Sequence, residues 1–299
     1  MSRLPEPASK PVAYGLLVFI MIIWASAFAG LRLVLREIDW VTLTMMRMVF
    51  AAGALLIAGL ILGTPFPKRQ DWWKVGLTGL FGFTFYHLAL NLGLEYITAG
   101  QGAFIISTIP IWTSILAWQF LSEKVTARTW AGMAVGLAGV GVISLEPSTM
   151  SISGGSFIVL FSAMCAGANI VIQKDLLKRY RALDVAVYAT SMGTLPLLFW
   201  LPWGIEPLQG LSTEGWLVVA YLGLVPIGLG YFLYQIALTT LEASRASQLQ
   251  LLIPPIAAVI AWFWIAEEPG ANLIIGGPII LAGVLLGNLE RRKKRKSKR

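Results

Sequence analysis

The sequence predicts an all-α integral membrane protein with ten transmembrane helices, arranged as two inverted five-helix repeats. Three observations lead to this fold class: apolar segments of membrane-spanning length, an internal repeat at a fixed offset, and Lys and Arg concentrated on alternate connections. Of the 299 residues, 57% are hydrophobic and 13% are charged, whereas soluble domains carry about 25% charged residues. This composition excludes an ordinary soluble domain.

Ten apolar runs have the length of a helix that crosses a bilayer, which is about 20 residues. In chain order they cover residues 13–35, 41–63, 72–93, 99–121, 127–145, 155–174, 184–203, 214–236, 244–266 and 271–289. The connections between them are short, so we expect no soluble domain.

The fourth and fifth runs repeat in the ninth and tenth. Residues 94–145 align without a gap to residues 238–289, at an offset of 144. The matched pairs include Pro110 with Pro254, Trp118 with Trp262, Glu123 with Glu267 and Gly132 with Gly276. We therefore divide the chain into a first repeat (1–147), a second repeat (148–290) and a basic tail (291–299). Because each repeat crosses the membrane an odd number of times, the second must be inverted relative to the first.

The basic residues fix the orientation. With the N-terminus inside, 20 of the 23 Lys and Arg residues fall on the inner side, Arg32 and Arg36 fall outside, and Arg47 lies within a run. Cytoplasmic connections carry such an excess of Lys and Arg. Both termini are therefore predicted to be cytoplasmic, and the tail is interpreted as a membrane anchor rather than a nucleic-acid-binding segment.

Several residues resemble those of a known family. They are Trp24-Ala25-Ser26-Ala27-Phe28, Arg47, Ala99-Gly100, Pro110, Glu123 and the glycine-rich fifth run, with Ala243-Ser244, Pro254, Glu267 and Gly276–Gly283 in the second half. The chain resembles the drug/metabolite transporter superfamily in its ten-helix EamA-type branch, and within it is most similar to the YddG-type exporters of aromatic amino acids. This resemblance implies export of small metabolites, commonly amino acids or drugs, without ATP hydrolysis. The chain departs from internal symmetry where Ala166 or Ala168 stands opposite Trp24, and Ser191 opposite Arg47.

Prolines lie near the middle of the fourth and ninth runs. A proline inside a helix removes a backbone hydrogen bond and bends the helix. Pro110, Pro254 and Pro255 are therefore interpreted as hinges beside a cavity, since they occupy matching places in the two repeats. The alternative is that they only shape the bundle.

Ionisable residues inside membrane segments are costly and mark candidate functional sites. Arg47 is a candidate for holding a substrate carboxylate, although its long side chain could instead reach the membrane surface. His87 and Asn91 lie four residues apart and so share one helix face. A neutral histidine could also be a packing residue, and its titration near neutral pH leaves proton coupling open.

The predicted substrate cavity combines these residues with other polar or aromatic residues of the runs. Its members are Trp24, Ser26, Arg47, His87, Asn91, Gln101, Asn169, Tyr188, Tyr234, Gln235 and Gln248. Aromatic walls with few charges would suit flat, partly apolar zwitterions.

Glycines recur on one face of the fifth run and of the tenth. They are Gly132, Gly136 and Gly139 in the former, and Gly276, Gly283 and Gly287 in the latter. Small residues at such spacing let helices approach closely in lipid. We expect these two helices to contact each other across the pseudo-twofold axis; the alternative is a homodimer contact, although a monomer is favoured.

Other classes of function are disfavoured. The single Cys165 and the single His87 argue against a disulfide, a metal site or a cofactor. Phosphate-binding and hydrolase motifs are also missing, so no enzyme is expected. The sequence thus favours a secondary transporter of a bacterial-type cytoplasmic (inner) membrane, which exports small molecules by alternating access between the repeats. Broad-specificity drug efflux and a passive facilitator are the alternatives.

Overall fold

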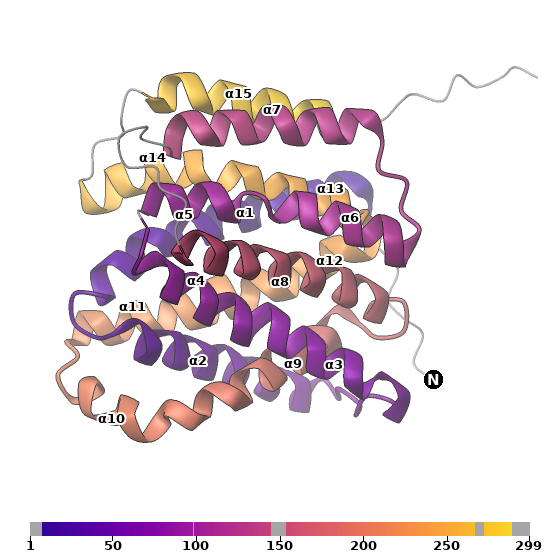
Figure 1. Cartoon of the computed structure of the whole chain (residues 1–299). Helices are drawn as coiled ribbons and strands as arrows, with labels where there is room; N and C mark the ends of the chain where they lie inside the picture. The colour runs from indigo at the N-terminus through magenta and orange to yellow at the C-terminus, as the bar shows by residue number, and fades with distance from the viewer. Residues whose placement is uncertain (1–7, 98, 145–153, 267–271, 289–299) are drawn as a thin grey trace, which may run out of the picture.

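The computed structural model describes residues 8–97, 99–144, 154–266 and 272–288, and these residues form a bundle of helices (Figure 1). The α-helices are α1 (Lys10–Val34), α2 (Trp40–Ile61), α3 (Trp72–Gly79), α4 (Tyr86–Leu94), α5 (Ala99–Ile106), α6 (Ile109–Leu121), α7 (Ala127–Ser144), α8 (Gly154–Leu176), α9 (Ala182–Thr194), α10 (Leu201–Gln209), α11 (Thr213–Leu222), α12 (Gly230–Thr240), α13 (Ala243–Gln248), α14 (Ile253–Ile265) and α15 (Asn272–Asn288). Short 3₁₀ segments are η1 (Arg69–Asp71), η3 (Leu195–Trp200) and η5 (Leu249–Leu252). Two π-helical turns are η2 (Leu80–Phe85) and η4 (Gly223–Leu229). Glu267 and the basic tail lie outside the described residues.

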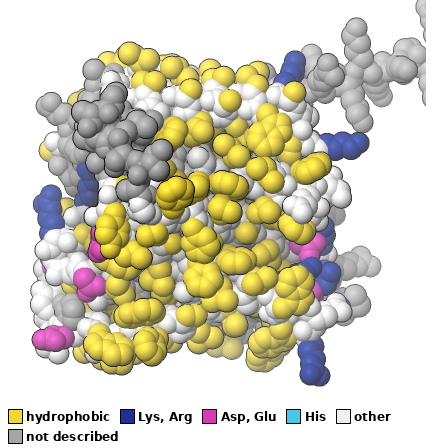
Figure 2. All heavy atoms as spheres, in the orientation of Figure 1, with side chains coloured by type: hydrophobic (Ala, Val, Ile, Leu, Met, Phe, Trp, Pro, Cys, Tyr) yellow, Lys and Arg dark blue, Asp and Glu magenta, His cyan; other side chains and the backbone are white. Residues whose placement is uncertain are grey.

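Each of the ten predicted segments is helical, and several consist of two or three consecutive helices. Within the described residues, eight helical stretches are long and apolar enough to cross a membrane, and α15 is a shorter apolar helix. Figure 2 shows apolar side chains covering the middle of the visible face, with charged side chains at its two ends. The prediction of an all-helical, multi-span membrane protein is confirmed.

The start of α1 and the end of α15 lie at the same end of the bundle, because the Tyr14 hydroxyl donates to Asn288 Oδ1 at 3.3 Å. At this end Lys74 and Lys178 pair with Asp175, and Arg179 pairs with Asp71. We call it the basic end, and the opposite end, where α1 meets α2, the far end.

The repeat is visible in the backbone. Ser122, after α6, and Ala266, after α14, are the non-glycine residues with positive φ, at 57° and 53°, in the part of the chain that the structure describes. They are 144 residues apart, as are the ends of the π-helical turns at Phe85 and Leu229. Ser122 lies at the basic end and Ala266 at the far end, which is the arrangement expected of an inverted repeat.

The two glycine-rich helices, α7 and α15, contact each other along their length (Figure 1). A Cβ atom added to Gly139 would lie 2.8 Å from the carbonyl oxygen of Gly276, and one added to Gly283 would lie 2.7 Å from that of Gly132. These two pairs exchange places under the offset of 144, so the contact lies on the pseudo-twofold axis. The predicted contact between the glycine faces is confirmed.

The prolines lie where the helix changes type. In the run 99–121 two turn residues separate α5 from α6, and in the run 244–266 the 3₁₀ segment η5 joins α13 to α14; Pro110 and Pro254 lie in the first turn of the helix that follows. Proline is tolerated there because the first turn has no hydrogen-bond acceptor for its missing N–H. The α-helical pattern is therefore interrupted at matching places in the two halves, and the hinge role of these prolines stays a prediction.

The two halves differ in how tightly these broken helices are packed. Helix α6 buries Ile109, Pro110, Thr113, Ser114 and Ala117. Their counterparts on α14, at an offset of 144, are all only half-buried. Because α6 runs toward the basic end and α14 toward the far end, the bundle is closed at the basic end and looser at the far end.

The glycine contact generates a stability prediction. Replacing Gly283 by Ala places a methyl group against the backbone of α7, and overpacking of this kind costs about 1–3 kcal/mol. We expect the melting temperature of the purified protein in detergent to fall. Gly277→Ala is the matched control, because a Cβ at Gly277 meets nothing within 4 Å; equal melting temperatures of the two variants would contradict the role of the contact.

Candidate functional site

Arg47 lies in α2, about two turns from the far end. Its side chain is buried, with 6% of the residue exposed, rather than reaching the membrane surface. Its Nε atom has no hydrogen-bond partner among the described residues. The backbone of Arg47 packs against η4, since a Cβ on Gly223 would lie 2.6 Å from the Arg47 carbonyl oxygen. The guanidinium is thus held inside the bundle with part of its hydrogen-bonding capacity unused.

His87 lies in α4, two residues after the π-helical turn η2. Its Nε2 atom is also buried without a partner in the described part of the chain, and 8% of the residue is exposed. The neighbouring Tyr86 ring lies 4.7 Å from the imidazole, centroid to centroid. Phe83 and Tyr231 pack in one apolar cluster with Met45 and Met48, the neighbours of Arg47 in α2, so Arg47, His87 and Tyr231 lie where α2, α4 and α12 meet.

On the side of α1, four aromatic rings pack against one another, and we call this group the aromatic wall. The Trp24 ring lies 5.3 Å from that of Tyr231 and 5.2 Å from that of Tyr234. Tyr231 in turn lies 4.8 Å from Phe83. The Trp24 Nε1 donates to the carbonyl oxygen of Pro226 in η4 at 2.9 Å, which fixes the indole in place.

We refer to these residues as the Arg47 cluster. Its members are Trp24, Arg47, Phe83, Tyr86, His87, Tyr231, Tyr234 and Gln250, whose Nε2 donates to the Tyr234 hydroxyl at 3.3 Å. Four of the predicted cavity residues therefore come together, and they come from both repeats.

Sequence reasoning missed Phe83, Tyr86, Tyr231 and Gln250. For Tyr231 a signal was present, because it stands 144 residues after His87 and is therefore its counterpart in the second repeat. Both residues follow a π-helical turn. Such turns shift the direction of the side chains that follow, and they occur frequently at functional sites.

The other predicted cavity residues form hydrogen bonds elsewhere in the bundle. The bonds nearer the far end are Ser26 Oγ with the Tyr221 hydroxyl at 2.6 Å, Asn91 Nδ2 to Thr44 Oγ1 at 2.7 Å, and Gln101 Nε2 to Ser156 Oγ at 3.4 Å. The remaining bonds are Thr78 Oγ1 to Asn169 Oδ1, Gln235 Nε2 to Gln173 Oε1 at 2.6 Å, Gln248 Nε2 to the Gly283 carbonyl at 3.3 Å, and the Tyr188 hydroxyl to the Pro65 carbonyl at 2.5 Å. The structure thus joins these side chains to neighbouring helices or, for Tyr188, to the connection after α2, and does not bring them into the Arg47 cluster.

The basic end is closed by a carboxylate at a helix N-terminus. Glu123, just after α6, accepts hydrogen bonds from the Ala243 N–H at 2.7 Å, and from the Ser244 N–H at 3.2 Å and hydroxyl at 2.9 Å. An anion is favoured at this position by the free N–H groups and the helix dipole. Lys174 closes the same end from α8, donating to the Leu238 and Leu241 carbonyls at the end of α12 at 2.5 and 2.7 Å.

A second group of contacts at the basic end joins the two halves; its second-half residues lie in the connection between α8 and α9. Arg179 and the Tyr180 hydroxyl both donate to the Asp71 carboxylate, at 2.5 and 2.8 Å. Burial raises the pKa of the Tyr180 hydroxyl and the Asp71 carboxylate raises it further, so Tyr180 is a neutral donor at neutral pH. The Lys68 N–H donates to the same hydroxyl at 2.9 Å.

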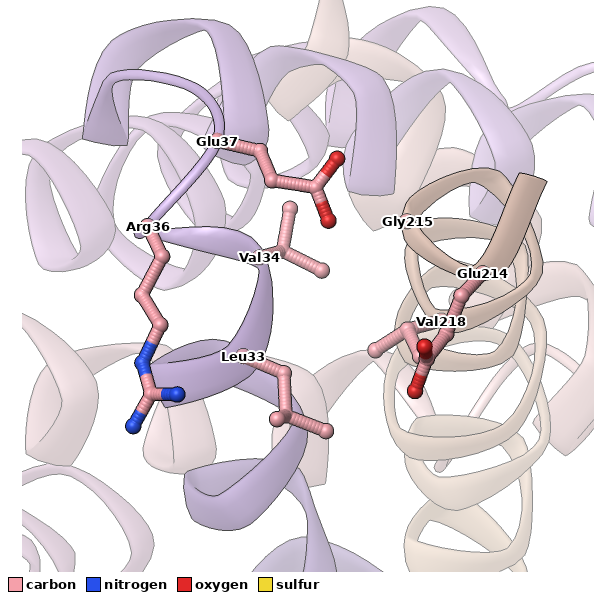
Figure 3. Close-up of a pocket in the computed structure, with 7 residues that line it drawn as sticks. All are labelled: Leu33, Val34, Arg36, Glu37, Glu214, Gly215 and Val218. Atoms are coloured by element: carbon pink, nitrogen blue, oxygen red, sulfur yellow. The ribbon is translucent and has the colours of Figure 1, made fainter. Parts of the chain in front are cut away.

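At the far end the equivalent connection borders a shallow pocket of about 310 Å³ between α1 and α11 (Figure 3). Glu37 reaches across it and accepts from the Ser212 N–H at 2.8 Å and hydroxyl at 3.0 Å. Ser212 is the counterpart of Lys68 in the repeat. Next to the pocket, Gly30 of α1 packs against Val218 and Leu222 of α11.

A model of the EamA-like transporter family matches residues 12–145 and 153–289, which together cover most of the chain. The chain belongs to the EamA-like transporter family. It is therefore a transporter of a multi-span membrane family, and its two matched stretches correspond to the two halves of the bundle.

Several curated proteins resemble this EamA-like transporter. A probable terminal-alkyne amino-acid exporter of Streptantibioticus cattleyicolor is 32% identical over 272 residues, which are 91% of this chain and 92% of the relative. The uncharacterized transporter YdfC of Bacillus subtilis is 30% identical, over 92% and 90% of the two chains. A solved crystal structure has the same fold, with a TM-score of 0.79 at 18% identity, over 94% of this chain and 97% of the other.

The cluster predicts the effect of removing its charge. Because a hydrogen bond to a charged group is worth about 1.5–3 kcal/mol, Arg47→Gln should raise the KM for a carboxylate substrate about 10- to 100-fold at normal protein levels. Arg36→Gln, at the rim of the far-end pocket, is the control and should leave the KM unchanged. Saturation kinetics unchanged by Arg47→Gln would remove Arg47 from the site.

The closure at the basic end can be tested by labelling. In a Cys165→Ala background, a cysteine introduced at the half-buried Gln250 should react with a membrane-impermeant maleimide from the far end only. Glu123→Gln removes the charge that caps α13 and so weakens the closure of the basic end. In vesicles whose basic end faces outward, the cysteine at position 250 should therefore become reactive. Glu242→Gln is the control, because Glu242 occupies the N-cap position of α13 but its side chain pairs with Arg245 and makes no capping hydrogen bond. The same pattern in both variants would contradict a gating role for Glu123.

Proposed function

We propose that this protein is a secondary transporter that exports small metabolites, in the first place amino acids with aromatic or apolar side chains, from the cytoplasm by alternating access. The observation that carries this proposal is the buried Arg47 side chain, whose Nε has no partner among the described residues, in a region of α2 that packs against aromatic residues of both halves. A buried charge without a partner is costly. A carboxylate ligand would supply the missing partner.

The aromatic wall supports the choice of side chain. Trp24, Tyr231 and Phe83 present ring faces and edges, and aromatic pairs at such spacings gain about 0.5–1.5 kcal/mol beyond the burial of their surface. An aromatic or apolar substrate side chain would add to this set of rings. The similarity to a probable terminal-alkyne amino-acid exporter points in the same direction.

The inverted halves support the mechanism. The bundle is closed at the basic end by the Glu123 cap and is looser at the far end, where α14 is only half-buried. Exchanging the packing of α6 and α14 would reverse this arrangement and expose the Arg47 cluster to the other side. We place the basic end in the cytoplasm, on the charge distribution, and the protein in a bacterial-type cytoplasmic membrane.

Transport in vesicles tests the proposal. Purified protein in proteoliposomes should show counterflow of labelled Phe and Trp, with weaker counterflow of Thr and little of a quaternary-amine drug, because only the amino acids carry a carboxylate for Arg47. Trans-stimulation identifies a carrier, whereas flux without it would identify a passive facilitator. Transport of the drug alone would contradict the proposal.

A further inference from the structure

The charges around the Arg47 cluster are unbalanced. Arg47 supplies one positive charge, and the acids that are buried in the described residues, Asp71 and Asp184, both lie at the basic end. Each is already paired there, Asp71 with Arg179 and Asp184 with Arg181.

In the sequence of the whole chain, too, no acidic residue falls in the middle of a predicted membrane segment. All 15 Asp and Glu residues fall in the connections or near the ends of these segments. At the basic end, Glu123 accepts from the N-terminus of α13 and Glu242 pairs with Arg245. The carboxylate of a ligand therefore has a cationic partner in the middle of the bundle, but a ligand ammonium has no anionic one.

Two neutral acceptors beside the aromatic rings already accept a hydrogen bond. The carbonyl oxygen of Pro226, which lies beside the aromatic wall, already accepts from Trp24. The Tyr234 hydroxyl accepts from Gln250. Moving an ammonium out of water to a place that holds a cation and no anionic partner is unfavourable, so a zwitterion binds here at a disadvantage relative to a monoanion.

We propose that the site recognises its ligand as a monoanion: it binds the carboxylate and the apolar side chain and does not require a free amino group. This inference rests on the proposed function and names its substrate class. Amino acids whose nitrogen is acylated, and which therefore carry only the carboxylate charge, should be transported at least as well as the free amino acids. A reaction that acylates the amino group would supply such substrates.

Three compounds with the same side chain separate the contribution of the carboxylate from that of the amino group. In proteoliposomes with the full chain, counterflow of labelled phenylalanine and of labelled N-acetylphenylalanine is measured, each with the other compound and with phenylalanine methyl ester as competitors. We expect half-inhibition by N-acetylphenylalanine at a concentration equal to or severalfold below that of phenylalanine, and no inhibition by the cationic ester.

The outcomes distinguish this inference from the proposed function. Counterflow of phenylalanine that N-acetylphenylalanine does not inhibit would overturn the inference and leave amino-acid export standing. Counterflow of N-acetylphenylalanine alone would support the inference and contradict export of free amino acids. Counterflow of neither compound would overturn both.

A variant that adds the missing charge provides a second test. Gln250→Glu places a carboxylate beside Tyr234 in the Arg47 cluster, and should shift the preference toward phenylalanine over N-acetylphenylalanine about tenfold or more. Gln250→Met is the matched control for loss of the amide; because Gln250 belongs to the cluster, only the ratio of phenylalanine to N-acetylphenylalanine transport, not the transport rate, is expected to match the wild type. A shift in Gln250→Met equal to that in Gln250→Glu would show that the added charge is not the cause and would contradict the inference.

Discussion

The structure depends on the contact between the backbones of α7 and α15. Helices in lipid gain little from burying apolar side chains against each other, so close backbone packing through small residues contributes much of their association. Gly132 with Gly283 and Gly139 with Gly276 provide that packing. Because these two pairs exchange under the internal repeat, the proposed exchange of conformations between the halves would leave the contact unchanged.

The rest of the bundle departs from this symmetry where a ligand would bind. Each half has a π-helical turn at the matching place, followed by His87 in one half and Tyr231 in the other. Arg47 has no charged counterpart, since Ser191 occupies the matching position. In the proposed mechanism the shared features serve the conformational change, and the unshared residues contact the ligand.

The sequence predicted the membrane segments, the inverted repeat and the glycine contact, because length, hydropathy and residue spacing determine them directly. It did not predict the π-helical turns η2 and η4: one extra residue in a turn rotates the following side chains by about 100°, and composition does not reveal it. It also could not separate Trp24 and Arg47, which meet in the cluster, from Asn169 and Gln248, which bond to neighbouring helices. Polar residues inside a span look alike in sequence, and only their partners distinguish them.

The central claim is that the two ends open and close in opposition around a fixed α7–α15 contact. Spin-label distance measurements test it most directly, with one pair at Lys124 and Thr239 on the basic end and another at Tyr96 and Phe263 on the far end. On addition of a transported substrate, the account predicts that the distance distribution of one pair lengthens while that of the other shortens. Distances that lengthen together, or that change at one end only, would contradict it.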